Sequence, residues 1–322
     1  MSYSFMFLPP VDDRRRRWAD ALGEEVPQIE ILLPGSREEA LERIGEVRGA
    51  FGSLDPELLA AARKLTWLCA PAAGPGPGFY FPELVDSDVT VTNQRGIYND
   101  HISAHIMAFV LAFARGLHLY MPQQLEGLWI SGGEAAPTVH LPEATAVLIG
   151  AGGIGGETAR HLAQFGMHVI AVDPRVPEPP EGVHELHRPE ALDEQIGRGD
   201  FVIMTAPQTP AMEGLMNAER LARMKPTGVL INIGRGVNVV LDDLADALYG
   251  GTIGGAALDV FEIEPLPEGH RLWKAPNFLM TPHVAGAGPY LEDRRLQLLI
   301  ENCRRLRDGE ELVNVVDKKN WF

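Results

Sequence analysis

The stretch at residues 146–173 constrains the fold more than any other part of the chain. It reads AVLIGAGGIGGETARHLAQFGMHVIAVD, in which Gly150, Gly152 and Gly155 form the pattern G-x-G-x-x-G. A short apolar run at 146–149 is typical of a buried strand, and a helical pattern of apolar residues follows the glycines. A second apolar run at 168–172 ends on Asp173. This order predicts a strand–helix–strand unit that binds a dinucleotide.

Each part of this unit has a chemical reason. Gly150 permits the tight turn out of the strand, Gly152 lets backbone approach a pyrophosphate, and Gly155 lets helix and sheet pack closely. The N-terminus of the helix offers free N–H groups and a partial positive charge to phosphates. Asp173, eighteen residues after Gly155, can accept both hydroxyls of an adenosine ribose. Its charge favours NAD over NADP, although Arg175 could serve a 2′-phosphate.

The composition limits the kinds of partner. The 322 residues suffice for two domains, and 45% hydrophobic with 22% charged residues indicates a globular protein. A net charge of −16 argues against nucleic acids and anionic membrane surfaces. The two cysteines, Cys69 and Cys303, stand far apart and favour a reducing compartment. With no membrane-length apolar run and no signal pattern, we expect a soluble cytoplasmic protein.

The first third of the chain alternates strand and helix patterns. Strands are expected near 3–8, 28–32, 47–51, 66–70 and 89–92, which predicts a parallel sheet. The fourth strand leads into the loop PAAGPGPG at 71–78. Ligands bind at the C-terminal ends of such strands, and Gly-rich backbone can present N–H groups to an anion. Composition alone does not distinguish this from a plain surface loop.

Polar residues follow the strands expected in the second half of the chain. Arg235, Asp259 and His283 each come just after a strand, and Glu264 follows Asp259 in the loop FEIEPLPEGH. Arginine can hold a carboxylate, histidine can move a proton, and a neighbouring carboxylate favours imidazolium. His101 and His105 have the spacing of two metal ligands on one helix face, but without a third ligand nearby they are interpreted as structural, and no metal is expected.

Four motifs together resemble the D-isomer-specific 2-hydroxyacid dehydrogenase family over nearly the whole chain. They are GAGGIG at 150–155, MKPTGVLINIGRG at 224–236, GAALDVFEIEPLP at 255–267 and LWKAPNFLMTPHVAG at 272–286. The resemblance implies an α/β fold with two Rossmann-like doubly wound parallel-sheet domains. The NAD-binding domain, residues 100–289, would be inserted into a flavodoxin-like substrate domain made of residues 1–99 and 290–322. Such proteins are typically homodimers joined through the nucleotide-binding domains.

The resemblance also implies roles for individual residues. Arg235 would bind the substrate carboxylate and carbonyl, His283 would be the acid/base paired with Glu264, and Asp259 would hold the nicotinamide carboxamide. The backbone at Ala73 and Gly74 matches the loop that binds the substrate carboxylate. The positions that match the family's cofactor site are Gly150, Gly152, Gly153, Ile154, Gly155, Asp173, Arg175, Ala206, Pro207, Thr209, Ile233, Asp259 and His283.

One departure from the family pattern concerns the substrate. The family's loop usually continues Val-Asp, whereas Pro75 and Gly76 follow Gly74 here, and proline has no N–H to donate. The expected activity is NAD(H)-dependent reduction of a small 2-keto acid to a D-2-hydroxy acid, or the reverse. Glyoxylate, hydroxypyruvate, pyruvate and longer 2-keto acids all stay open. The alternative from another class is an NAD(H)-sensing corepressor-type binding protein on the same scaffold.

Overall fold

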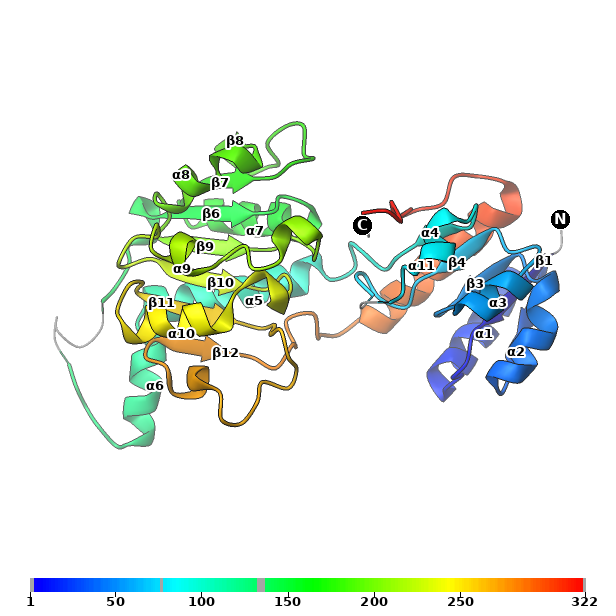
Figure 1. Ribbon diagram of the computed structural model, residues 1–322, viewed down its shortest axis with the longest axis horizontal. Helices are drawn as coiled ribbons and strands as arrows, with labels where there is room; N and C mark the ends of the chain where they lie inside the picture. The colour runs from blue at the N-terminus through cyan, green and yellow to red at the C-terminus, as the bar shows by residue number, and fades with distance from the viewer. Residues whose placement is uncertain (1–2, 76–77, 132–136, 321–322) are drawn as a thin grey trace. The chain divides into compact units, whose positions relative to one another are not determined.

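The computed structural model describes residues 3–75, 78–131 and 137–320, which form two compact units (Figure 1). One unit combines Met1–Ile97 with Pro289–Phe322, and the other is Tyr98–Gly288. The sequence places these junctions at 99–100 and 289–290. The glycines and prolines at 121–142 predict an irregular loop or arm. Its positions 132–136, like 76–77 of the Gly-rich loop, lie outside the described residues.

The first unit is built on a five-stranded sheet in the order β2-β1-β3-β4-β5, with every pair parallel. This is the strand order of flavodoxin-like sheets. Its elements are β1 (Tyr3–Phe7), α1 (Asp13–Glu25), β2 (Ile29–Leu32), α2 (Arg37–Arg43), the 3-10 turn η1 (Ile44–Glu46), β3 (Gly49–Phe51), α3 (Pro56–Ala61), β4 (Trp67–Cys69), α4 (Pro82–Asp86), β5 (Thr90–Thr92) and α11 (Leu291–Asp308).

Alternating side chains on these strands build a core on each face of the sheet. Met6 and Leu68 pack with residues of α2, α3 and α4, whereas Phe5 and Trp67 pack with residues of α1 and α11. The two-residue period of a strand dictates this alternation. Helix α11 lies in this unit although the second unit precedes it in the chain. The tail that follows returns to β5, where the Val316 N–H donates to the Val91 carbonyl at 2.8 Å.

The second unit has a seven-stranded parallel sheet in the order β12-β11-β10-β9-β6-β7-β8. The order reverses between β6 and β9, where open α/β sheets bind ligands. Its elements are α5 (Asn99–Ala114), α6 (Leu117–Leu125), η2 (Leu141–Glu143), β6 (Thr145–Ile149), α7 (Gly153–Gln164), β7 (His168–Val172), β8 (Glu185–His187), η3 (Pro189–Ala191), α8 (Leu192–Ile196), β9 (Phe201–Met204), η4 (Pro210–Met212), α9 (Ala218–Leu221), β10 (Val229–Asn232), η5 (Gly236–Asn238), α10 (Leu241–Tyr249), β11 (Gly255–Leu258), η6 (Arg271–Lys274) and β12 (Phe278–Met280).

Helices cover both faces of this sheet (Figure 1). Val147 and Ile149 pack with residues of α8, α9 and α10, and Ala146 and Leu148 pack with residues of α5 and α7. The sheet is therefore buried on both sides, as the continuous apolar runs of its strands require. The α/β class with two doubly wound parallel sheets, predicted from the sequence, is confirmed.

The apolar pattern from residue 99 predicts one long helix to about residue 118, but the structure divides it in two. Helix α5 ends at Ala114, and Gly116 adopts a left-handed conformation with φ of 69°, which redirects the chain into α6. Residues 121–125, expected to be irregular, are helical. Within the described ranges no single helix is long and apolar enough to cross a membrane, and only α5 and α6 together, across a 75° bend, reach that length and composition.

Candidate active site

The glycine-rich turn between β6 and α7 lies where the strand order reverses. Gly150 has φ of +100°, a conformation that side chains rarely adopt, and a Cβ on it would lie 2.9 Å from the Ala206 nitrogen. A Cβ on Gly155 would lie only 2.1 Å from the Gly150 carbonyl oxygen. Any larger residue at either position would push β6, α7 and the 205–209 loop apart. The turn is therefore closed on its inner side by backbone alone.

The outer side of the same turn is open. Gly152 is the N-cap of α7, no side chain caps the helix there, and a Cβ on Gly152 would meet nothing within 4 Å. The first N–H groups of a helix lack partners within the helix and attract anions. Gly152 and Gly153 are both exposed, and Ile154 is half-buried behind them. These residues fit a pyrophosphate, which would receive hydrogen bonds from the start of α7.

Asp173 stands at the end of β7 and is only 2% exposed. Its Oδ2 accepts from the Ala151 N–H at 2.8 Å, and its Oδ1 accepts from the Arg175 N–H at 2.8 Å and the Val176 N–H at 3.0 Å. Burial raises the pKa of this carboxyl, but the three backbone donors and the Arg175 charge outweigh it and hold the pKa below its usual range.

These contacts change what Asp173 offers to a cofactor. A carboxylate has about four lone-pair positions, and three are already used, so one position on Oδ2 is left for a ribose hydroxyl. The expectation that Asp173 accepts both ribose hydroxyls stays a prediction, and these hydrogen bonds leave one free position for it. The carboxylate also ties β7 to the glycine-rich turn, because Ala151 is the residue between Gly150 and Gly152.

Two arginines lie near Asp173: Arg175 is on the turn that follows it, and Arg188 follows β8 and bonds to that turn. Arg175 is exposed, and Arg188 donates through Nη1 to the carbonyl oxygens of Asp173 at 3.0 Å and Val176 at 3.2 Å. Arg188 was not among the residues expected from the sequence. The remaining cofactor candidates lie at the ends of β9 and β10: Ala206 and Ile233 are buried, and Pro207 and Thr209 are half-buried in the loop before η4.

His283 and Glu264 form a hydrogen-bonded pair. His283 Nδ1 lies 2.7 Å from Glu264 Oε2, and the other carboxylate oxygen accepts from the Phe261 N–H at 2.9 Å. The Phe261 contact fixes the carboxylate, which in turn orients the imidazole. Because a carboxylate accepts, the Nδ1 proton faces Glu264 and Nε2 faces away from it. The His283 side chain is 54% exposed, so solvent and small molecules can reach this nitrogen.

Arg235 follows β10 in a turn that Asn232 holds in place. Asn232 is fully buried; its Nδ2 donates to the Arg235 carbonyl at 3.0 Å, and its Oδ1 accepts from the Gly234 N–H at 3.0 Å. Burial lowers the pKa of the Arg235 guanidinium, and the charge of Glu264 opposes that shift. The residue stays a cation, because arginine is not deprotonated in proteins. The structure thus brings Arg235, Glu264 and His283 together.

Asp259, at the end of β11, is 1% exposed and bonds within the protein. Its Oδ1 accepts from Thr281 Oγ1 at 2.5 Å and from the Val284 N–H at 2.9 Å. Its Oδ2 accepts from the Ala285 N–H at 2.9 Å. A role toward the nicotinamide remains a prediction, and the visible contacts make Asp259 the anchor of the turn that carries His283.

Ala73 and Gly74 lie in the first unit, in the loop after β4. The loop is held by β5: Asn93 Nδ2 donates to the Ala73 carbonyl at 2.8 Å, and the Gln94 N–H donates to the Ala72 carbonyl at 3.4 Å. Asn93 is 2% exposed. Sequence reasoning did not identify Asn93, although its place directly after a strand is the same signal that identified Arg235.

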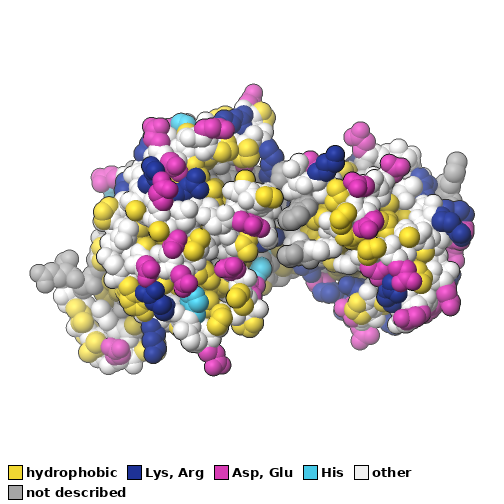
Figure 2. Space-filling model, in the orientation of Figure 1, with side chains coloured by type: hydrophobic (Ala, Val, Ile, Leu, Met, Phe, Trp, Pro, Cys, Tyr) yellow, Lys and Arg dark blue, Asp and Glu magenta, His cyan; other side chains and the backbone are white. Residues whose placement is uncertain are grey.

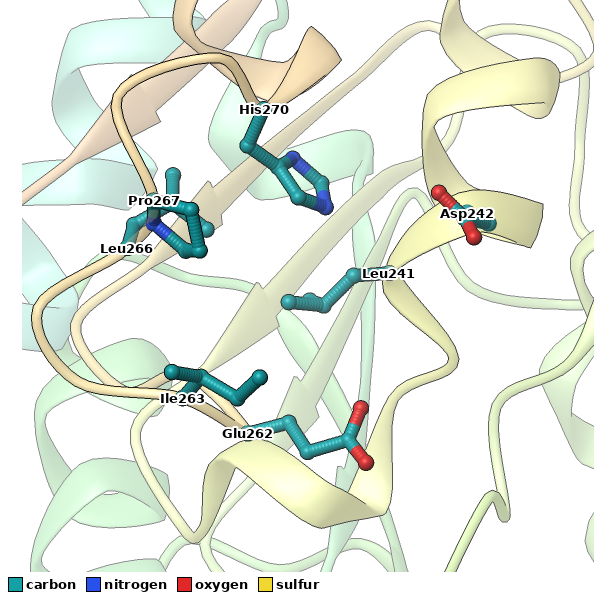
Figure 3. Close-up of a pocket in the computed structure, with 7 residues that line it drawn as sticks. All are labelled: Leu241, Asp242, Glu262, Ile263, Leu266, Pro267 and His270. Carbon is teal, nitrogen blue, oxygen red and sulfur yellow. The ribbon is translucent and has the colours of Figure 1, made fainter.

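A surface pocket of about 240 Å³ lies beside the loop that carries Glu264 (Figure 3). Leu241, at the start of α10, extends toward the loop residues Glu262, Ile263 and Leu266. Arg235, Glu264 and His283 do not line it, so it is separate from the group described above.

The histidines at metal-ligand spacing have other contacts. His105 Nε2 lies 2.9 Å from Thr281 Oγ1. Across the part of the chain that the structure describes, no cluster of three or more His, Cys, Asp or Glu side chains could hold a metal ion.

A dinucleotide cradle and a histidine–carboxylate pair on one doubly wound sheet are the features of a nicotinamide-dependent oxidoreductase. The family model described as "D-isomer specific 2-hydroxyacid dehydrogenase, NAD binding domain" matches residues 107–285. The chain belongs to the D-isomer specific 2-hydroxyacid dehydrogenase family. The resemblance noted from its motifs is thereby confirmed, and so is its character as an NAD(P)-dependent enzyme that acts on 2-hydroxy or 2-keto acids.

Individual relatives agree with this assignment. Glyoxylate reductase of Thermofilum pendens is 31% identical over 294 residues, which cover 89% of this chain and 86% of that protein. Glyoxylate/hydroxypyruvate reductase A of Photorhabdus laumondii is 33% identical over 215 residues, or 67% of this chain and 66% of that protein. The crystal structure of a D-isomer specific 2-hydroxyacid dehydrogenase from Xanthobacter autotrophicus Py2, in complex with NADPH and MES, superposes with a TM-score of 0.86 at 30% identity and 100% coverage of both chains.

Proposed function

We propose that this enzyme reduces a small 2-keto acid to the D-2-hydroxy acid, with Arg235, Glu264 and His283 as its catalytic residues. Arg235 would bind the carboxylate and carbonyl oxygen of the substrate. His283 would donate its Nε2 proton to the carbonyl oxygen as the hydride arrives at carbon, and would accept that proton in the reverse direction. The cofactor supplies the hydride when bound.

The observation that carries this proposal is the 2.7 Å contact between His283 Nδ1 and Glu264 Oε2. It fixes which ring nitrogen is directed away from the carboxylate, so that Nε2 can face the substrate. The Phe261 N–H on the other Glu264 oxygen keeps the carboxylate from rotating. The Glu264 charge also acts on Arg235, which supports a role for the cation at the same site.

Glyoxylate and hydroxypyruvate are the substrates that we favour. Relatives that are 31% and 33% identical are named glyoxylate reductase and glyoxylate/hydroxypyruvate reductase A. The Ala73–Gly74 backbone would hold the substrate carboxylate, with one donor fewer than usual because Pro75 lacks an N–H. A turnover screen of glyoxylate, hydroxypyruvate, pyruvate and longer 2-keto acids tests this choice. The two small acids should show the highest kcat/KM, and turnover of none of these acids would reject the proposed function.

For the cofactor, we infer a preference for NADH with NADPH also accepted. Asp173 keeps its negative charge beside the site of a 2′-phosphate, whereas Arg175 on the turn after it and Arg188 after β8 could offset it. The relative solved with NADPH supports use of both cofactors in the family. Steady-state kinetics with each cofactor decides the order, and a higher kcat/KM with NADPH would contradict the preference.

The proposal extends to assembly and location. Exposed apolar residues gather on α6 and just after it: Leu117, Met121, Leu125, Leu128, Trp129 and Ile130. Yellow side chains are visible at this end of the second unit in Figure 2. A second copy of the chain is the partner that we propose for this surface, which makes the enzyme a homodimer joined through its NAD-binding domains.

We also propose a cytoplasmic location, which cell fractionation tests. The corepressor alternative is not favoured, because the relatives named above are reductases and dehydrogenases.

A further inference from the structure

A chain of side-chain hydrogen bonds joins helix α5 to the turn that carries His283. His105 Nε2, on α5, lies 2.9 Å from Thr281 Oγ1, and Thr281 Oγ1 lies 2.5 Å from Asp259 Oδ1. All three residues belong to the unit Tyr98–Gly288, but His105 is 176 residues away from Thr281 in sequence. The functional site described above uses neither His105 nor Thr281.

The chemistry of the groups sets the direction of each bond. Asp259 accepts the Val284 and Ala285 N–H groups, so its carboxylate is an acceptor and the Thr281 hydroxyl proton must point to it. That hydroxyl has one proton, so toward His105 it can only accept. His105 therefore carries a proton on Nε2 and donates to Thr281. Its ring is also held edge-on against Phe109, with centroids 4.8 Å apart and an interplanar angle of 90°.

Asp259, the last residue in this series of hydrogen bonds, controls the backbone of His283. The His283 N–H donates to the Asp259 carbonyl at 2.8 Å, and the next two N–H groups donate to the Asp259 carboxylate. His283 has φ of 55°, a left-handed conformation that is costly for a residue with a Cβ. Such a conformation persists only where its surroundings enforce it. Asp259 enforces it here, and Thr281 fixes the Asp259 carboxylate.

We propose that His105 and Thr281 are positioning residues for the proton transfer: through Asp259 they hold His283 in the conformation that directs its Nε2 at the substrate. The inference rests on the proposed function of His283. Loss of the His105 donor would leave Thr281 free to rotate away from Asp259, and the 283–285 turn would relax toward ordinary backbone angles. Misplacement of a catalytic group on this scale lowers kcat more than it raises KM, because binding through Arg235 is untouched.

The first experiment replaces His105. His105→Leu removes the donor, and His105→Gln returns an amide N–H near the position of Nε2. We expect kcat for keto-acid reduction to fall roughly tenfold in His105→Leu, with KM within about twofold of wild type, and His105→Gln to recover most of the loss. His161→Leu is the matched control. His161 also lies on a helix of this unit and bonds to Arg160 and Glu157, away from the turn, so kcat should not change.

The second experiment tests whether the two residues act in one chain. Thr281→Val removes the hydroxyl, and Thr281→Ser keeps it, so the serine variant should retain activity that the valine variant loses. In the double variant His105→Leu/Thr281→Val, kcat should be no lower than in Thr281→Val alone. Losses that multiply would overturn the inference, and so would wild-type kcat in His105→Leu. Thermal unfolding of each variant separates loss of activity from loss of fold.

The same assays distinguish failure of this inference from failure of the proposed function. If wild type turns over 2-keto acids and His283→Gln does not, the proposed function holds whatever the His105 variants show. If His283→Gln is as active as wild type, the proposed function fails, and the inference falls with it.

Discussion

His283 is constrained in both its backbone and its side chain. Its left-handed φ of 55° costs on the order of 1–2 kcal/mol for a residue with a Cβ. Three backbone N–H groups of the turn donate hydrogen bonds to Asp259, and the imidazole ring donates one to Glu264. A side chain that only needed to fill space would not require this arrangement. The cost is understandable if the imidazole must reach a substrate from a fixed direction.

Asp173 is the second residue whose contacts define its role, and its ionisation links stability to pH. The native pKa is lower than that of an ordinary carboxyl, because three backbone N–H groups stabilise the charged form against the effect of burial. A group with a depressed native pKa adds stability above its unfolded pKa, near 3.9, and this contribution disappears as pH falls through the native value.

We therefore predict that Asp173→Asn is destabilising at neutral pH and much less so in acid. Loss of charged hydrogen bonds should lower the free energy of unfolding by about 1–3 kcal/mol at pH 7. The difference between wild type and variant should narrow between about pH 5 and 3, as the wild-type carboxyl is protonated. Urea unfolding across this range measures both quantities. A difference that stays constant with pH would show that the charge of Asp173 does not stabilise the fold.

At the scale of elements, the β6–α7 turn contains two glycines with different roles: Gly155 is structural, and Gly152 faces the expected ligand. A Cβ on Gly155 would lie 2.1 Å from the Gly150 carbonyl oxygen, whereas a Cβ on Gly152 would meet no protein atom within 4 Å. The two positions should therefore respond differently to the same substitution. Gly155 joins the helix to the strand, and Gly152 faces the place where we expect the pyrophosphate.

We predict opposite phenotypes for the two alanine variants. Gly155→Ala should lower the free energy of unfolding by about 1–3 kcal/mol, because the turn must open to admit the methyl group. Gly152→Ala should unfold like wild type but bind NADH about 10- to 100-fold more weakly, since the methyl displaces charge-assisted bonds to phosphate. Calorimetric unfolding and titration with NADH measure the two effects. If Gly152→Ala binds NADH as tightly as wild type does, the pyrophosphate does not bind at this turn.

The elements show which parts of the fold follow from local sequence. All strands except β8 were predictable, since each is an apolar run bounded by turn residues, and parallel pairing follows from the helices between them. Helix α6 was missed because the predicted helix ran through Gly116 to about residue 118, and because Pro122 is usually a breaker. Gly116 does end α5 through its left-handed conformation, but Pro122 is accommodated inside α6. Strand β8 is half-buried and only three residues long, so its sequence shows no recognisable alternation of apolar and polar residues.

The residues of the site were predictable from the sequence, but the contacts between them were not. Arg235, Glu264 and His283 come from strand ends and from motifs that resemble a family, so the sequence could indicate them. The contacts that organise them could not be read there, because Asp259 with Thr281, and Thr281 with His105, meet only in the folded chain. Asp173 shows the same limit: its position was predictable, but not the three backbone donors that occupy it.

At the scale of the whole molecule, the exposed apolar residues on and after α6 indicate how the protein assembles. Leu125 is 89% exposed and Trp129 is 94% exposed, and both follow the break at Gly116. Large exposed apolar side chains grouped in one segment mark a binding surface. A homodimer through the NAD-binding domains would cover them, despite the net charge of −16 on each chain.

We predict that Leu125→Glu/Trp129→Glu converts a dimer into a monomer. Burying two carboxylates without partners would cost more than the contacts contribute. Light scattering coupled to gel filtration gives the mass of each species. The control is Phe165→Glu. Phe165 is an exposed apolar residue at the end of α7, outside α6 and the residues that follow it, so this variant should stay dimeric. A monomeric wild type would contradict the proposed assembly, and so would a double variant that remains dimeric.

The central claim is that His283, paired with Glu264, transfers the proton, and the dependence of kcat/KM on pH tests it most directly. Reduction needs the charged imidazole, so it should fall as pH rises, and oxidation of the hydroxy acid should fall as pH decreases. Glu264→Gln keeps a hydrogen-bond partner but loses the carboxylate that orients the ring, so kcat/KM for reduction should fall roughly tenfold. His283→Gln should lose on the order of 10²–10⁴-fold in turnover. Reduction that does not fall as pH rises, together with near wild-type turnover in His283→Gln, would contradict the account.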